Sequence, residues 1–298
     1  MGRISKKTFI GYTAGIVTGV TYGLNPLFAV PLMHGGATVE GILLMRYLVA
    51  VAFLGIFLLI KGESFRVTGR QLVILLLLGV LFACSSLFLF EAYNYIASGL
   101  ATTLVFLYPV LVALIMLFLG VKPSWQVWVA IGVTFTGVTV MTRGGGGGNA
   151  AFTGILFSVT SALVYALFIV IINRSVSIRR LSNSLLTFYA LATGAVMFLA
   201  KGLMSGAPLL AGLDTPVSWL NIAGLALFPT VISTATLALA TRDIGAAKAS
   251  VLGVFEPITA IAVGTLALGE TLSANIIVGI VISVAAVTFM IATSKEKG

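Results

Sequence analysis

Long apolar stretches alternate with short polar ones along the whole chain. An α-helix needs about 20 residues to cross a bilayer core of roughly 30 Å. The apolar stretches lack the period-two alternation of barrel strands. They fall at 9–33, 40–60, 71–94, 97–119, 125–142, 152–173, 184–201, 217–241, 246–268 and 274–293. The pattern predicts an all-α membrane protein with ten transmembrane helices. Eight or nine is the competing count, because the break at 95–99 is weakly polar.

The basic residues divide unevenly between the predicted loops. With the N-terminus inside, fourteen of the seventeen Lys and Arg residues fall on the cytoplasmic side. Only Arg143 and Lys201 fall outside, and Arg46 lies within a span. Cytoplasmic loops of membrane proteins carry an excess of Lys and Arg. The bias therefore predicts that both termini are cytoplasmic, and it favours ten spans over the other counts.

The first and sixth predicted spans share a ridge of small residues. In each span four such residues are spaced by four, and a shift of 143 positions carries one set onto the other. The sets are Gly11, Gly15, Gly19 and Gly23, and Gly154, Ser158, Ala162 and Ala166. Small residues at this spacing let helix backbones approach closely in lipid. Helix packing is the plain interpretation of the ridge; the functional one is that it lets one bundle rock against the other.

The same relation holds for two polar or proline positions and defines two halves. A shift of 143 carries Tyr22 to Tyr165, and a shift of 148 carries Pro109 to Pro257. Five spans is an odd number, so the halves are inverted relative to each other, as in many secondary transporters. We therefore expect two inverted five-helix repeats around a central cavity. The first is at 1–143, a Gly-rich linker at 144–151, and the second at 152–298.

Five polar side chains are candidates for lining that cavity: Tyr22, Asn25, Tyr108, Tyr165 and Glu256. The first and sixth spans place a tyrosine near the bilayer centre, where a phenol needs a hydrogen bond or a wet cavity. A carboxylate at such depth is costly and by default marks a function. Proton coupling and contact with a substrate ammonium both fit Glu256. The structural alternatives are ordinary hydrogen bonds between helices.

Four prolines within the spans predict helix breaks: Pro26, Pro109, Pro229 and Pro257. Proline removes a backbone hydrogen bond from the helix interior. Tyr108 and Glu256 each directly precede one of these prolines, so both halves place a polar group beside a break.

Arg46 and Glu91 lie at similar depths near the outer ends of the second and third spans. Pairing would offset the cost of placing each charge in the membrane. A structural ion pair is the main interpretation. An external gate, or contact with a substrate carboxylate, is the alternative.

Composition excludes several other classes of protein. The chain is 59% hydrophobic and 8% charged, whereas a soluble domain carries roughly 25% charged residues. Its net charge of +9 comes without a basic face interleaved with aromatics, so we expect no nucleic-acid partner. No zinc motif, nucleotide loop or nucleophile elbow occurs in the sequence, so we expect no metal, no cofactor and no enzyme activity.

The second half contains DIGAAKASVLGVFEPITAIAVGTLALGETLSANIIVGIVI from Asp243 to Ile282. This segment resembles the EamA-type branch of the drug/metabolite transporter superfamily, with its Gly-Ala turn, Glu-Pro midspan and Gly-Glu-x-Leu-Ser exit. The first half gives a weaker copy from Tyr95 to Gln126, in which Tyr108 replaces the Glu and Val121 stands in place of Glu270. These departures weigh against a mechanism with two carboxylates.

The resemblance implies a ten-helix basket that exports or exchanges small metabolites through a bacterial cytoplasmic membrane. Among family members, amino-acid exporters suit the available tyrosines, phenylalanines and few charges, because the spans lack Lys or Arg clusters for phosphorylated substrates. We expect a secondary transporter or facilitator working by alternating access. A multidrug or other metabolite permease of the same fold is the alternative. A passive channel and a membrane-embedded scaffold are alternatives from other classes.

Overall fold

The computed structural model describes residues 6–121, 125–144, 149–178, 181–206, 208–245, 249 and 251–293. Within these ranges the chain forms helices joined by short turns, without a β-strand. The helices are α1 (Lys6–Gly23), α2 (Asn25–His34), α3 (Val39–Ile60), α4 (Gly69–Ala92), α5 (Ser98–Val105), α6 (Tyr108–Phe118), α7 (Trp125–Gly144), α8 (Asn149–Arg174), α9 (Asn183–Ser205), α10 (Pro216–Ala226), the π-helix η1 (Leu227–Ile232), α11 (Ser233–Ile244), α13 (Phe255–Leu266) and α14 (Ala274–Thr293). The prediction of an all-α protein is confirmed.

Seven helical segments within the described residues are long and apolar enough to cross a membrane. They are Lys7–His34, Val39–Ile60, Gly69–Ala92, Ser98–Phe118, Ala151–Arg174, Asn183–Ser205 and Pro216–Ile244. Each corresponds to one predicted span. Of the other three predicted spans, 125–142 and 274–293 match α7 and α14, and 246–268 contains the shorter α13; α13 and most of α14 are apolar but shorter than a span. Of the predicted linker at 144–151, residues 145–148 lie outside the described part of the chain.

Polar side chains in the turns fix where several helices begin. The Thr38 Oγ1 accepts the Gly41 N–H at 3.1 Å ahead of α3. The Ser182 Oγ accepts the Leu185 N–H at 3.2 Å ahead of α9. The first N–H groups of a helix have no partner within it, so such caps favour these starting points.

Prolines stand where four of the predicted spans lose regular α-helix. Pro26 lies in the first turn of α2, directly after α1 ends, and Pro109 lies in the first turn of α6, after α5 ends. Pro229 lies within η1, which joins α10 to α11. Pro257 lies near the start of α13. Because proline donates no backbone hydrogen bond, each residue loosens the helix at that depth.

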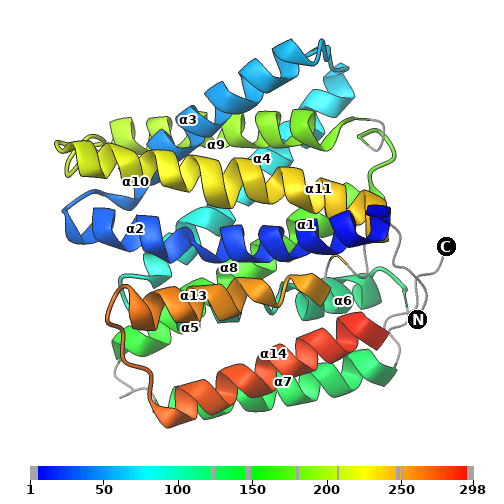
Figure 1. The fold of residues 1–298 in the computed structure, drawn as a ribbon, viewed down its shortest axis with the longest axis vertical. Helices are drawn as coiled ribbons and strands as arrows, with labels where there is room; N and C mark the ends of the chain where they lie inside the picture. The colour runs from blue at the N-terminus through cyan, green and yellow to red at the C-terminus, as the bar shows by residue number, and fades with distance from the viewer. Residues whose placement is uncertain are drawn as a thin grey trace.

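The helices run side by side across the molecule (Figure 1). α1 begins and α14 ends at the same end of the molecule, where the turns from α3 to α4 and from α8 to α9 also lie (Figure 1). The principal helix pairs join the first half to the second: α3 packs on α9, α5 on α13, α7 on α14, α1 on α11 and α13, and α8 on α4, α5 and α6. The two halves therefore interleave and share one helical bundle.

The largest buried cluster lies where α3, α4 and α9 meet. The rings of Tyr47 and Phe198 pack edge to face, with centroids 5.5 Å apart, and neither they nor Phe90 retain accessible surface. The buried Tyr47 hydroxyl donates to the Ser86 Oγ at 2.7 Å. This part of the bundle is packed and its tyrosine is satisfied, which distinguishes it from the tyrosine cluster described next.

Candidate functional site

Tyr108 and Tyr165 meet between α6 and α8. Their ring centroids are 4.9 Å apart, and the rings are nearly perpendicular at 83°. Tyr165 also stacks on Phe168, with centroids 5.7 Å apart, and lies beside Phe82. Both tyrosines are half-buried. This edge-to-face arrangement builds an aromatic wall at the junction of the two halves.

Glu256 and Tyr22 complete the cluster from α13 and α1. Glu256 is 9% exposed, and its carboxylate has no hydrogen-bond or ion-pair partner among the described residues. It lies within electrostatic range of Tyr22, Tyr108 and Tyr165. The structure thus places Tyr108 against Tyr165, and packs the α1 segment that carries Tyr22 against the α13 segment that carries Glu256. An unpaired carboxylate beside three phenols can receive a cationic group or a proton.

Asn25, the fifth predicted residue, lies at the break between α1 and α2. Its Nδ2 donates to the Tyr22 carbonyl oxygen at 2.9 Å, which offsets part of the hydrogen bonding lost at the break. Its Oδ1 is buried and accepts no hydrogen bond. The side chain therefore supports the backbone that carries Tyr22 and keeps one free acceptor.

The glycine ridge of α1 sets how closely α1 approaches the segment carrying Glu256. A Cβ on Gly19 would come within 2.8 Å of the Phe255 Cβ, and one on Gly23 within 2.6 Å of the Thr259 Cβ. Real Cβ atoms do not approach so closely, so only glycine fits at these positions. The ridge thus acts as a packing surface that holds Tyr22 against α13.

Hydroxyl groups link α1 to α11 and α8 to α4 in corresponding ways. The Thr18 Oγ1 bonds the Thr236 Oγ1 at 2.8 Å, and the Ser233 Oγ donates to the Thr18 carbonyl at 3.4 Å. The Ser161 Oγ donates to the Ser85 carbonyl at 2.7 Å, and the Ser85 Oγ donates back to the Ser161 carbonyl at 3.1 Å. A shift of 143 carries Thr18 to Ser161, and a shift of 148 carries Ser85 to Ser233.

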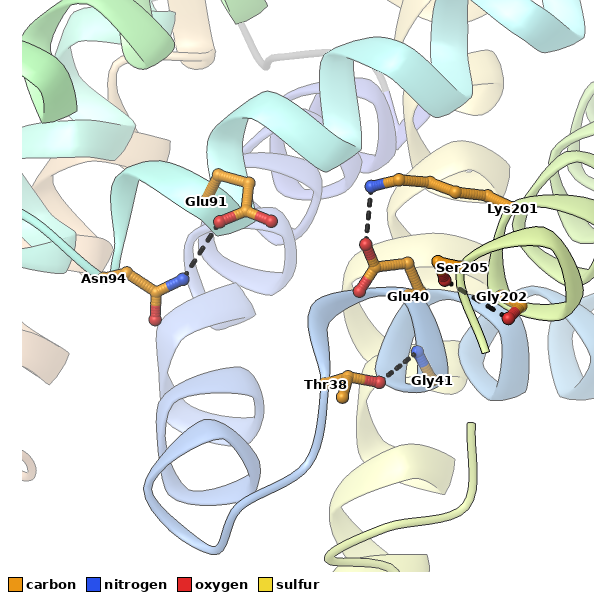
Figure 2. A network of polar contacts seen from close by, with 8 residues as sticks. All are labelled: Thr38, Glu40, Gly41, Glu91, Asn94, Lys201, Gly202 and Ser205. Carbon is orange, nitrogen blue, oxygen red and sulfur yellow. Dashed lines mark hydrogen bonds and ion pairs between the residues drawn. The ribbon is translucent and has the colours of Figure 1, made fainter. Parts of the chain in front are cut away.

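The predicted ion pair between Arg46 and Glu91 is not formed. The Arg46 Nε donates to the Thr230 Oγ1 at 2.9 Å. The Glu91 Oε2 accepts from the Asn94 Nδ2 at 3.1 Å (Figure 2). The two residues lie at similar depth, but their side chains do not meet. The depth of a residue along its helix does not say in which direction its side chain points around the helix axis. Arg46 lies in the bundle interior and Glu91 beside the turn that follows α4.

An unpredicted ion pair lies near the same end of the bundle. The Lys201 Nζ and the Glu40 Oε1 are 2.5 Å apart and join α9 to the first turn of α3 (Figure 2). Lys201 is one of the two basic residues expected on the outer side. The sequence shows Glu40 at the start of one predicted span and Lys201 at the end of another. It does not show that these two spans are neighbours, so the pairing could not be predicted.

Glu270 makes a contact that sequence reasoning missed. Its Oε1 accepts the Ser98 N–H at 2.9 Å, and its Oε2 accepts the Gly99 N–H at 3.5 Å. A carboxylate at a helix N-terminus satisfies free N–H groups and complements the helix dipole. Gly264 leaves the space that Glu270 occupies. A carboxylate of the second half therefore caps α5 of the first half.

A groove of about 520 Å³ lies between α3, α9 and α11, lined in part by Phe57, Lys61, Asn183 and Arg242. None of the five predicted cavity residues lines this groove. Within the described residues, no three His, Cys, Asp or Glu side chains gather as metal ligands do. The tyrosine and glutamate cluster therefore lies apart from this groove.

The sequence profile of the EamA-like transporter family matches residues 9–143 and 152–292. A solved structure described as "Crystal structure of protein" is similar over 97% of this chain and 96% of its own, with a TM-score of 0.65 at 18% identity. At that identity the likeness shows the fold alone. No curated protein matches the sequence.

Proposed function

The chain belongs to the EamA-like transporter family, and we propose that it exports small metabolites, amino acids first among them, across a bacterial cytoplasmic membrane. Membership makes it a membrane transporter with a small-molecule substrate. One observation carries the proposal: Glu256 is buried without a partner beside Tyr22, Tyr108 and Tyr165. Such a site suits a solute that has a cationic group and an apolar body.

The proposed architecture is ten spans in two inverted repeats with cytoplasmic termini. The corresponding hydroxyl pairs, Thr18 with Ser233 and Ser161 with Ser85, support it, because each pair links the same two elements of opposite halves. The helix pairings also support it, since exchanging the halves turns the packing of α1 on α11 into that of α8 on α4. The common end of α1 and α14 agrees with both termini lying on one side (Figure 1).

Alternating access follows from this arrangement. Packing through small side chains and single hydroxyl bonds costs little to shift compared with large interlocked side chains. The breaks at Pro26, Pro109 and Pro257 lie beside the site and provide hinge positions. A solute bound at Glu256 is thereby exposed first to one side and then to the other.

A multidrug or other metabolite permease is the second candidate, and it rests on the aromatic wall of Tyr108 and Tyr165. Aromatic rings accept many apolar solutes, whereas a buried carboxylate selects for a cationic group. The function of a passive channel or a scaffold would not depend on the charge of Glu256.

Flux in proteoliposomes tests the proposal. We expect saturable, substrate-dependent movement of one or more amino acids from a panel, measured with and without an imposed pH gradient. Faster flux under the gradient would identify proton coupling, and equal flux would identify facilitated diffusion. Absence of flux for every amino acid, together with movement of cationic drugs, would instead favour the multidrug candidate.

A further inference from the structure

Arg46 is a cation buried in the bundle interior. Its side chain is 2% exposed, and its guanidinium carbon lies 6.0 Å from the Tyr47 ring centroid and 5.7 Å from that of Phe90. These are the outer limits of cation–π contact, so the rings confine the group more than they neutralise it. A charge held in this way within a membrane is expensive to maintain.

No carboxylate of the described residues pairs with Arg46. Among those residues, one ion pair joins Lys201 to Glu40 and the other joins Arg242 to Asp243. Glu256 does not pair with Arg46 either, although both lie within electrostatic range of Tyr22. The guanidinium and the carboxylate therefore belong to the same region of the bundle interior without forming an ion pair. This separation leaves a positive and a negative group both open to a third partner.

Thr230 fixes the orientation of the guanidinium. Its Oγ1 accepts from the Arg46 Nε at 2.9 Å and donates to the Leu225 carbonyl at 3.0 Å, an i to i−5 contact from the π-helical turn η1 back to α10. Short π-helical turns occur frequently at functional sites. Among the described residues, Arg46 donates a hydrogen bond through Nε alone, so its two terminal nitrogens keep their donors free there.

The other half lacks this cation. The caps Thr38 and Ser182 align α3 with α9 at a shift of 144, which carries Arg46 to the buried Ala190. A shift of 148 relates Thr230 to Phe82. An alanine and a phenylalanine fill the corresponding places, so helix packing alone does not require an arginine there. No carboxylate of the described residues accounts for its presence in one half.

We infer that Arg46 binds the carboxylate of the transported solute and that Thr230 is a positioning residue for it. Two free guanidinium nitrogens match the two oxygens of a carboxylate in a bidentate pair. With Glu256 receiving the ammonium, the site selects zwitterions over amines and amides. This inference rests on the proposed function, because it assigns specificity to the same transport site.

The test compares each amino acid of a panel with its C-terminal amide. Both are measured in wild-type protein and in Arg46→Gln, Arg46→Lys, Thr230→Val and Thr230→Ser, with Lys201→Gln as a matched loss of one positive charge away from the site. We expect wild type and Lys201→Gln to prefer the acid by about tenfold or more, and Arg46→Gln to lose the preference. Arg46→Lys and Thr230→Val should keep part of it, and Thr230→Ser should keep most.

Two readouts separate this inference from the proposed function. Flux in proteoliposomes reports transport, and ligand-induced thermal stabilisation in detergent reports binding. Amino-acid flux with equal preference for acid and amide would overturn the role of Arg46 and leave the transporter standing. Stabilisation by acids that disappears in Arg46→Gln, without flux of any solute, would support the site and overturn the proposed function. If neither readout distinguishes acid from amide, the inference is wrong.

Discussion

The helix break beside Tyr108 and the break beside Glu256 occupy corresponding places in the two halves and differ in chemistry. Tyr108 and Glu256 each directly precede a proline, and each lies within electrostatic range of the other. The first presents a phenol that packs on Tyr165, and the second presents a carboxylate without a partner. The comparison teaches that both halves keep the broken helix, whereas only the second half places a carboxylate directly before the proline.

Close packing at the Glu256 break gives the largest expected effect. Gly23→Val should destabilise the protein by about 3 kcal/mol, because its side chain would meet the Glu256 carbonyl and Thr259. Gly132→Val is the control, since nothing lies within 4 Å of a Cβ at that position. Thermal unfolding in detergent measures both. Equal stability of the two variants would show that α1 does not depend on this approach.

Exchanging the two polar groups sharpens the comparison directly. Glu256→Gln should lower amino-acid flux by about tenfold, equivalent to about 1.4 kcal/mol, and should change its pH profile. Tyr108→Phe should reduce flux less, because the ring contact with Tyr165 persists without the hydroxyl. Flux across a range of pH values is the measurement. Wild-type flux with an unchanged pH profile in Glu256→Gln would assign the carboxylate to structure.

In the first half Val121 stands where Glu270 stands, so that position offers no carboxylate for a cap like the one on α5. Glu270→Gln should cost about 1 kcal/mol, because the amide loses the charge that complements the helix dipole. Gly264→Ala should have a similar effect by displacing the carboxylate. Hydrogen exchange at the Ser98 and Gly99 amides checks this. Protection equal to wild type in both variants would contradict the cap.

The smallest expected effect concerns the hydroxyl pairs. Thr18→Val and Ser161→Ala should each cost about 0.6 kcal/mol, because each removes an interhelical hydrogen bond of ordinary strength in a membrane. Thermal unfolding of both variants, with Thr136→Val as an exposed control, measures the difference. A much larger loss of stability in one variant would show that the contact of α1 with α11 and the contact of α8 with α4 are not equivalent.

Seven of the predicted spans were recovered as apolar helices in the described part of the chain, because apolar run length can be read directly from the sequence. Tyr22, Tyr108 and Tyr165 were chosen for depth and correspondence between halves, and the structure brings them beside Glu256. Depth does not give the facing direction of a side chain around its helix. The pairing of Arg46 with Glu91 therefore failed, although both residues were placed at similar depth.

Contacts between distant parts of the chain could not be derived from the pattern. Arg46 and Thr230 are 184 residues apart, and the π-helical turn that presents Thr230 has no clear signal besides Pro229. Glu270 was noted in its motif, but its partner in the other half depends on how the halves interleave.

The cap between Glu270 and α5 has a consequence for how the protein is made. Ser98 receives its acceptor from a residue synthesised 172 positions later. Until then the start of α5 has open N–H groups, which are costly to leave unpaired in a membrane. The first half thus enters the bilayer without the cap on α5, and this cap forms only after the second half has been synthesised.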